Sequence, residues 1–280
     1  MNYVSRKHGL CHAVDVSQLP SVEPNSFAHL NGLGIAHDDI KDIFIPLAAM
    51  IWRRYQCWHS NFPMIIGVTG AASVGKSIFT EVLFTLLTSW CERGEVSCFT
   101  TDNFLFSSHA LESMGLRHHK GFPESFDQTA MQQCLSDIRV GHSVIIPDND
   151  HKLGGRRLNL CQQIDHPNIV LVEGVNAIYF GHYSSQVDIG IFLEAPLEAI
   201  KCWFLKRLKS FIGTSCCDSS SYFHALKGLY PEQMDEYLSR VWEEVELENY
   251  HLNILSQRDS ADWVIDKKCD HAIKGLWLKG

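Results

Sequence analysis

The chain has 280 residues, of which 45% are hydrophobic and 20% charged, and its formal net charge is −8. This composition fits one globular domain over residues 1–280, in which the polar residues 1–25 are expected to be flexible. The acidic balance argues against a nucleic-acid partner, because such proteins need a basic surface. No run reaches the ~18 apolar residues of a membrane span, and the first residues lack the apolar segment of a signal peptide. We therefore expect a cytoplasmic protein with no membrane partner.

The apolar pattern predicts an alternation of helices and strands along the chain. An apolar stripe indicates a helix near Asp38–Tyr55, with Pro46 as a kink or break. Short apolar runs then indicate strands at 63–69, 95–100, 168–172, 187–193, 261–265 and 272–278. Amphipathic stretches indicate helices at 76–90, 127–140 and 196–211 and from Pro231 onward. The alternation predicts an α/β fold: a mainly parallel sheet flanked by helices, with additional helices at the N-terminus and in the C-terminal half.

A phosphate-binding motif follows the strand predicted at 63–69. The pattern G-x-x-x-x-G-K-[ST] is matched in full by Gly70, Ala71, Ala72, Ser73, Val74, Gly75, Lys76 and Ser77. Its glycines allow backbone angles in which the N–H groups turn inward toward phosphate oxygens. Lys76 is expected to reach the β- and γ-phosphates of ATP, and Ser77 to be a ligand of Mg²⁺. An apolar strand before the motif and a helix after it favour a P-loop NTPase-like fold over a chance match.

Two acidic residues follow predicted strands and should meet the phosphate loop at one edge of the sheet. Asp102 follows the strand at 95–100, and we expect that strand to lie next to the strand before Gly70. A carboxylate there can hold Mg²⁺ or accept the proton of an acceptor hydroxyl, although an ordinary turn aspartate is the alternative. Glu173 follows the strand at 168–172, where it either orders a metal-bound water or only caps a turn.

A cluster of basic residues lies on the helix predicted at 196–211. Arg207 can close over the γ-phosphate as the transition state forms. The alternative is a solvated basic helix face that Arg207 shares with Lys201, Lys206 and Lys209.

From about Ala28 to its C-terminus the chain resembles the type I (bacterial, P-loop) pantothenate kinases, of which it is a divergent member. The resemblance is carried by IFIPL (43–47), GAASVGKS (70–77), TTDNFL (100–105), KGFPESFD (120–127), VEGVN (172–176), SYFHAL (221–226), NILSQR (253–258) and the stretch from Lys267 to His271. It implies ATP and Mg²⁺ as cofactors, pantothenate as the phosphoryl acceptor, a homodimer, and feedback inhibition by coenzyme A at a site that overlaps the ATP site.

The resemblance also implies roles for individual residues. Asp102 becomes the base or orienting carboxylate for the acceptor hydroxyl, and Arg207 stabilises the transferring phosphoryl group. The acceptor is contacted by His151, by Asn253 and by the position of Phe204. The adenine is flanked by Lys267 and His271.

Several residues depart from the family pattern. The tyrosines that surround the acceptor-site histidine in the family are replaced by Asn149 and Gly154, and Phe204 stands where the family has tyrosine. Each lost partner of a buried substrate group costs ~1–3 kcal/mol, so two or three such losses are enough to shift the acceptor preference by orders of magnitude. The nearby Arg156 and Arg157 either belong to a surface hairpin or favour a more anionic acceptor.

Glu81 stands where the family has an arginine that binds a phosphate of coenzyme A. An anion at this position repels that phosphate, so we expect weak coenzyme A feedback.

Three functions from different classes are compatible with the sequence. The first is an active pantothenate kinase, and the second a related kinase with another hydroxylated acceptor. The third is a nucleotide-binding protein without turnover, which the presence of Lys76, Asp102 and Arg207 argues against. The favoured mechanism is direct in-line transfer from ATP to a primary hydroxyl, without a phosphoenzyme.

Overall fold

The structure is a computed structural model of the chain. It describes residues 2–5, 35–92, 95–150, 155–178, 186–215, 226 and 228–279, and at 2–5, 117, 148–150, 155–160 and 215 it describes the backbone only.

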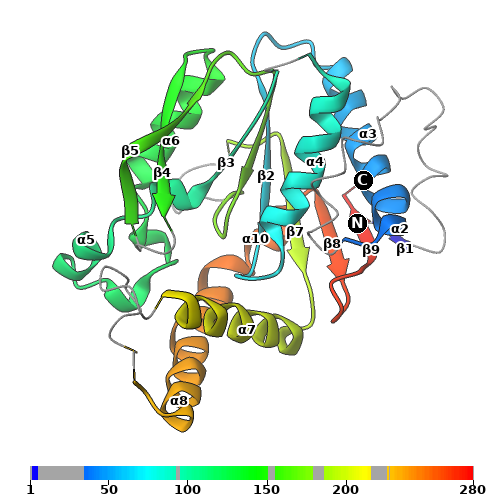
Figure 1. Cartoon of the computed structure of the whole chain (residues 1–280). Coiled ribbons are helices and arrows are strands. Elements are labelled where there is room, and N and C mark those ends of the chain that lie inside the picture. Colours follow the sequence, from blue (N-terminus) through cyan, green and yellow to red (C-terminus); the bar gives the residue numbers. More distant parts are fainter. Residues whose placement is uncertain are drawn as a thin grey trace.

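A seven-stranded sheet forms the centre of the molecule (Figure 1), with the order β1-β9-β8-β7-β2-β6-β3. The strands are β1 (Asn2–Ser5), β2 (Met64–Gly70), β3 (Val96–Thr100), β6 (Ile169–Glu173), β7 (Ile189–Glu194), β8 (Trp263–Lys267) and β9 (Ile273–Leu278). The five strands from β8 to β3 are parallel, whereas β9 and β1 are antiparallel to their neighbours. This confirms the predicted α/β fold with a mainly parallel sheet.

The central strands are buried on both faces because a separate hydrophobic cluster covers each face. Along β2, Ile66 points into the cluster that contains helices α3 (Ile45–Gln56) and α4 (Lys76–Trp90). Its neighbour Ile65 points into the opposite cluster, which contains α6 (Gln128–Arg139). Side chains alternate between the two faces because a strand has a two-residue period. Burial on both faces holds β2, and with it the loop that follows β2, at the centre of the sheet.

The predicted N-terminal helix is confirmed, but Pro46 does not break it. The helical run consists of α2 (His37–Asp39), a π-helical turn η4 (Ile40–Phe44) and α3, and Pro46 is the second residue of α3. Pro46 comes just after the π-helical turn, which already departs from the i→i−4 hydrogen-bond ladder that a proline would otherwise interrupt. Leu47 and Ile51 are fully buried, so much of the apolar stripe belongs to the core.

A hairpin and α6 lie beside β3. The short elements before them are η5 (Thr101–Phe104), α5 (Ser108–Ser113), η6 (Arg117–His119) and η7 (Pro123–Ser125). Asp127 caps α6 as predicted, since its carboxylate accepts the N–H of Ala130 at 3.0 Å. The strands β4 (Val144–Asp150) and β5 (Gly155–Ile164) pair antiparallel, which places residues 156 and 157 on a strand of a hairpin; the roles expected of their side chains stay predictions.

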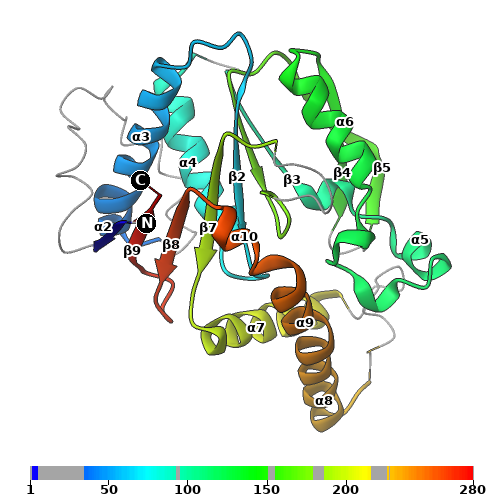
Figure 2. The same cartoon turned by 180° about the vertical axis from the view of Figure 1, so that it is seen from behind.

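Most of the C-terminal helical run lies below the carboxyl-terminal end of the sheet in the views of Figures 1 and 2, whereas its last helix, Gln257–Ser260, lies beside β2 and β7. The helices of this run are α7 (Leu197–Ser215), α8 (Pro231–Val241), η9 (Trp242–Glu246), α9 (Leu247–Asn249), η10 (Tyr250–Ile254) and α10 (Gln257–Ser260), of which η9 and η10 are π-helical. Among the described helices, none has both the length and the apolar composition that a membrane crossing requires.

The first strand was not predicted. Asn2–Ser5 pairs with β9 at the edge of the sheet, within the segment that was expected to lack regular structure. Residues 6–34 lie outside the described residues.

Candidate active site

The phosphate loop joins the centre of the sheet to α4. Gly70 and Gly75 have φ angles of 144° and 100°, which L-residues rarely adopt. A Cβ atom at Gly70 would lie 2.5 Å from the carbonyl oxygen of Leu193, so β7 also excludes a side chain there. Lys76 and Ser77 begin α4 directly after the loop, at the helix end whose free N–H groups favour anions.

The side chains of Lys76 and Ser77 are both engaged. The Lys76 ammonium donates to the carbonyl oxygens of Gly70 and Ala71 at 3.1 and 2.9 Å. The Ser77 hydroxyl donates to Glu173 Oε1 at 2.9 Å. Burial lowers the pKa of Lys76, and the nearby charges of Glu173 and Asp102 oppose that shift. Glu173 therefore lies directly beside the loop, as predicted.

Asp102 reaches the site from farther away than predicted. β6 lies between β2 and β3, so Asp102 follows the second strand from the loop rather than its neighbour. The turn that holds it is well defined: Thr100 Oγ1 accepts the N–H of Asp102, and Asn103 Oδ1 accepts the N–H of Thr100. The charge of Asp102 still acts on Lys76 and Glu173, so the structure brings these groups together.

Two charged residues of this site were missed from the sequence. Glu246, at the end of η9, is partly buried, and burial raises its pKa to about 7 while the charges of Lys76 and Arg207 oppose the shift. Burial lowers the pKa of Lys120, and the charge of Asp102 opposes that shift. Lys120 lies in the KGFPESFD segment, which was a usable signal. Glu246 lies in no motif that we recognised.

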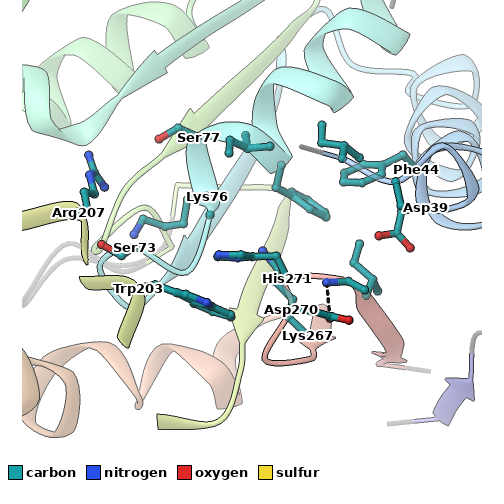
Figure 3. Close-up of a pocket in the computed structure, with 17 residues that line it drawn as sticks. Asp39, Phe44, Ser73, Lys76, Ser77, Trp203, Arg207, Lys267, Asp270 and His271 are labelled. Carbon is teal, nitrogen blue, oxygen red and sulfur yellow. Dashed lines mark hydrogen bonds between the residues drawn. The ribbon is translucent and has the colours of Figure 1, made fainter. Parts of the chain in front are cut away.

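A cavity of about 710 Å³ opens on one side of the phosphate loop (Figure 3). Its lining includes Ser73, Lys76 and Ser77 from the loop and Trp203, Arg207 and His271 from more distant parts of the chain. The rings of Trp203 and His271 are stacked with centroids 3.7 Å apart. An aromatic wall beside a phosphate cradle suits a nucleotide, because a base can stack on it.

Lys267 supports the phosphate loop directly. Its ammonium donates to the carbonyl oxygen of Val74 at 2.7 Å and lies 5.8 Å from the Trp203 ring centroid. Burial lowers its pKa to about 8. Lys267 and His271 both line the large cavity, as expected of residues that flank a base, but Lys267 also fixes the loop.

Residues of α7 point in different directions. The guanidinium of Arg207 lies 5.2 Å from the ring centroid of Phe211, and Arg207 lines the large cavity. Phe204 packs against Trp242 with ring centroids 5.7 Å apart, and it lines neither of the two cavities described here. The acceptor contact expected of Phe204 therefore stays a prediction.

A second cavity, of about 90 Å³, is lined by amide side chains. Asn253 is among them, together with Asn176, Asn249 and Gln257. The sequence predicted only Asn253 of this group as an acceptor contact. His151 and Gly154 lie outside the described residues, and the side chain of Asn149 is not described.

Comparison with known proteins links this geometry to kinases. The profile of the phosphoribulokinase / uridine kinase family matches residues 65–219. A pantothenate kinase of Bradyrhizobium sp. (strain ORS 278) is 32% identical over 286 residues, which cover 92% of this chain and 90% of the relative. A pantothenate kinase of Coxiella burnetii (strain RSA 331 / Henzerling II) is 33% identical over 228 residues, or 78% of this chain and 72% of the relative.

Solved structures share the fold at low sequence identity. The YGR205w protein has a TM-score of 0.62 and 13% identity, with 86% of this chain and 98% of that chain covered. The YFH7 protein of Saccharomyces cerevisiae has a TM-score of 0.54 and 11% identity, with 80% and 98% covered.

Proposed function

We propose, from the premise that the chain belongs to the pantothenate kinases within the phosphoribulokinase / uridine kinase family, that it phosphorylates the primary hydroxyl of pantothenate with ATP. That reaction is the first step of coenzyme A synthesis in the family. The observation that carries the proposal is the meeting of Lys76, the Ser77–Glu173 pair and Asp102 at one edge of the sheet, in a chain 32% identical to a pantothenate kinase over 92% of its length.

The residues beside the loop fit Mg²⁺, which the family uses with ATP. The Ser77 hydroxyl and a Glu173 carboxylate oxygen are 2.9 Å apart, and both are hard oxygen ligands of the kind that Mg²⁺ prefers. Among the described residues, no group of three His, Cys, Asp or Glu side chains forms a metal site. When bound, Mg²⁺ neutralises phosphate charge.

Each polar group has a task in direct in-line transfer. The N–H groups of the loop and Lys76 hold the β- and γ-phosphates. Asp102 orients the primary hydroxyl of the acceptor and takes its proton as the new O–P bond forms, while the bond between the γ-phosphorus and the β–γ bridging oxygen breaks and ADP leaves. Arg207 leaves its position over Phe211 and compensates the charge of the transferring group. Trp203 and His271 provide the stacking surface for adenine.

Further properties follow from family membership. We propose a cytoplasmic homodimer that coenzyme A inhibits only weakly, because Glu81 replaces a phosphate-binding cation. A kinase with a different acceptor is less favoured, since relatives that cover most of the chain are pantothenate kinases.

The test is ADP release by the purified protein with ATP, Mg²⁺ and pantothenate, beside a panel of other hydroxylated acceptors. We expect saturable turnover with pantothenate and at least ~10-fold lower kcat/KM with the other acceptors. Saturable turnover with another acceptor alone would assign a different substrate to the same site. ATP binding without turnover on any acceptor would contradict the kinase function.

A further inference from the structure

The small cavity lies where three distant segments meet. Gly121 comes from the loop before η7, Val175 and Asn176 follow β6, and Asn249, Asn253 and Gln257 are spaced four residues apart on the C-terminal helical run. Asn253 lies within the π-helical turn η10, and such turns are frequent at functional sites. Val175 and Asn176, which line the cavity, follow Glu173 at the end of β6 by two and three residues. The cavity is therefore near the proposed reaction centre.

Backbone carbonyls dictate the orientation of the amides. Asn249 Nδ2 donates to the carbonyl oxygen of Gly121 at 2.8 Å, and a carbonyl can only accept. Asn249 Oδ1 must therefore be the atom that accepts from Asn253 Nδ2, at 2.9 Å. That bond uses one N–H of Asn253, so its Oδ1 and its second N–H remain for a molecule in the cavity.

The other end of the helical run is anchored in the same manner. Gln257 is 2% exposed, and its Nε2 donates to the carbonyl oxygen of Val175 at 2.7 Å. Its Oε1 accepts from the Thr69 hydroxyl at 3.2 Å. Gln257 thus fixes the backbone at Val175, immediately before Asn176.

Asn176 has an unused acceptor. The residue is only 6% exposed, and its Oδ1 has no hydrogen-bond partner among the described residues. A buried polar atom without a partner is uncommon in proteins and is costly for the folded state. Since Asn176 lines the cavity, a donor group of a bound molecule can satisfy this oxygen.

We propose that Asn176 determines acceptor specificity by accepting, through Oδ1, a hydrogen bond from an N–H or O–H of the substrate beside Asn253. The inference rests on the proposed function and deepens it. Pantothenate has two donors besides its reacting hydroxyl, the amide N–H and the secondary hydroxyl, whereas its carboxylate has none. A cavity of about 90 Å³ holds part of such a molecule, with the carboxylate outside. Asn249 is a positioning residue, because its Oδ1 holds the Asn253 amide.

The test compares pantothenate with two analogues, one methylated at the amide nitrogen and one lacking the secondary hydroxyl. In the native protein, loss of the donor that Asn176 binds should lower kcat/KM at least ~10-fold. In Asn176→Leu the same analogue should differ from pantothenate by less than ~3-fold, because the acceptor oxygen has gone. KM for ATP should stay within ~2-fold. Asn249→Leu should raise KM for pantothenate, because it releases the Asn253 amide, but it should leave the discrimination at Asn176 in place.

Asn168→Leu is the matched control. Asn168 comes directly before β6, at the end of the strand away from Asn176, and its amide donates to Glu95. It should leave the discrimination unchanged. Asn176→Ala replaces the leucine variant if that variant does not fold. The proposal would be overturned if a folded Asn176 variant still discriminated against the same analogue. It would also be overturned if the native protein used both analogues with the same kcat/KM as pantothenate. In either case, turnover of pantothenate would leave the proposed function intact.

Discussion

Asp102 is the carboxylate on which the proposed proton transfer depends. Its backbone N–H is held by Thr100, so a change of its side chain should leave the turn in place. We expect Asp102→Asn to lower kcat ~10²-fold or more, since the amide cannot take the proton of the acceptor hydroxyl. Lys76→Ala should have a comparable effect, because it removes the charge that holds the β- and γ-phosphates. Circular dichroism should show an unchanged fold in both variants. Near-normal turnover of Asp102→Asn would contradict its role.

Glu246 should make stability depend on pH. Its pKa rises from an ordinary 4.5 to about 7 in the folded protein, mainly through burial. Below pH 4.5 both states are protonated and the group costs no stability; between pH 4.5 and 7 only the unfolded state ionises, so the stability cost grows across this window and is complete above pH 7. Glu246→Gln should therefore raise the Tm by a few degrees at pH 8, and this gain should disappear near pH 5.

Glu244→Gln is the control for that measurement, because Glu244 lies on the same π-helical turn but is exposed. Its Tm should follow that of the native protein at both pH values. A gain for Glu246→Gln that is equally large at pH 5 would mean that the buried charge is not its cause.

Glu81 is the residue through which regulation is expected to differ from that of the family. It lies on α4, one turn beyond Ser77. Coenzyme A should inhibit the native protein weakly, and Glu81→Arg should lower the inhibitory concentration ~10-fold by replacing repulsion with attraction. Steady-state inhibition curves measure this effect. Inhibition of the native protein at low micromolar coenzyme A would contradict the expectation.

At the scale of elements, Gly174 sets the contact between the end of β6 and η5. A Cβ atom at Gly174 would overlap the Thr101 hydroxyl and lie 2.8 Å from Thr101 Cβ. Gly174→Ala should therefore push η5 away, displace Asp102 from Glu173, and lower turnover ~10-fold or more. The assay is ADP release at saturating substrates.

Gly141→Ala separates this effect from backbone strain. Gly141 also has a positive φ angle, 81°, but no atom lies within 4 Å of a Cβ added there. We expect that variant to lose roughly 1 kcal/mol of stability and no turnover. Equal turnover of the two alanine variants would show that the contact with Thr101 does not position Asp102.

The sequence predicted the elements whose pattern is local. Helix α4 has the bounds that its amphipathic run indicated, and the phosphate loop is recognisable because its glycines and lysine are fixed in spacing. The prediction that β3 lies next to β2 was wrong, because β6 lies between them. Strand order depends on packing between distant segments rather than on any local pattern. Glu246 was missed for the same reason, because burial alone distinguishes it from other glutamates. Asn176 lies in the VEGVN segment, but no local pattern gave it a role, and its unpaired oxygen is visible only in the structure.

At the scale of the whole molecule, the oligomeric state is the main expectation still to be tested. The apolar stripe of α3 is largely covered by the protein's own core, so it does not itself require a partner. Family membership nevertheless implies a homodimer. Light scattering coupled to size exclusion should give twice the chain mass of 31.8 kDa. A mass equal to one chain at micromolar concentration would contradict the dimer.

Thr69 lies between the two proposed substrate sites, so it can couple the binding of one substrate to the binding of the other. Its hydroxyl contacts Gln257 and the carbonyl oxygen of Val175 on the acceptor side, and its own peptide continues into Gly70 on the nucleotide side. In the proposed assignment, the two substrates therefore bind to surfaces that share one buried residue. Any factor by which ATP changes the affinity for pantothenate must equal the factor by which pantothenate changes the affinity for ATP. Thr69→Val, which keeps the shape and removes the hydroxyl, is the substitution that should bring that factor closest to one.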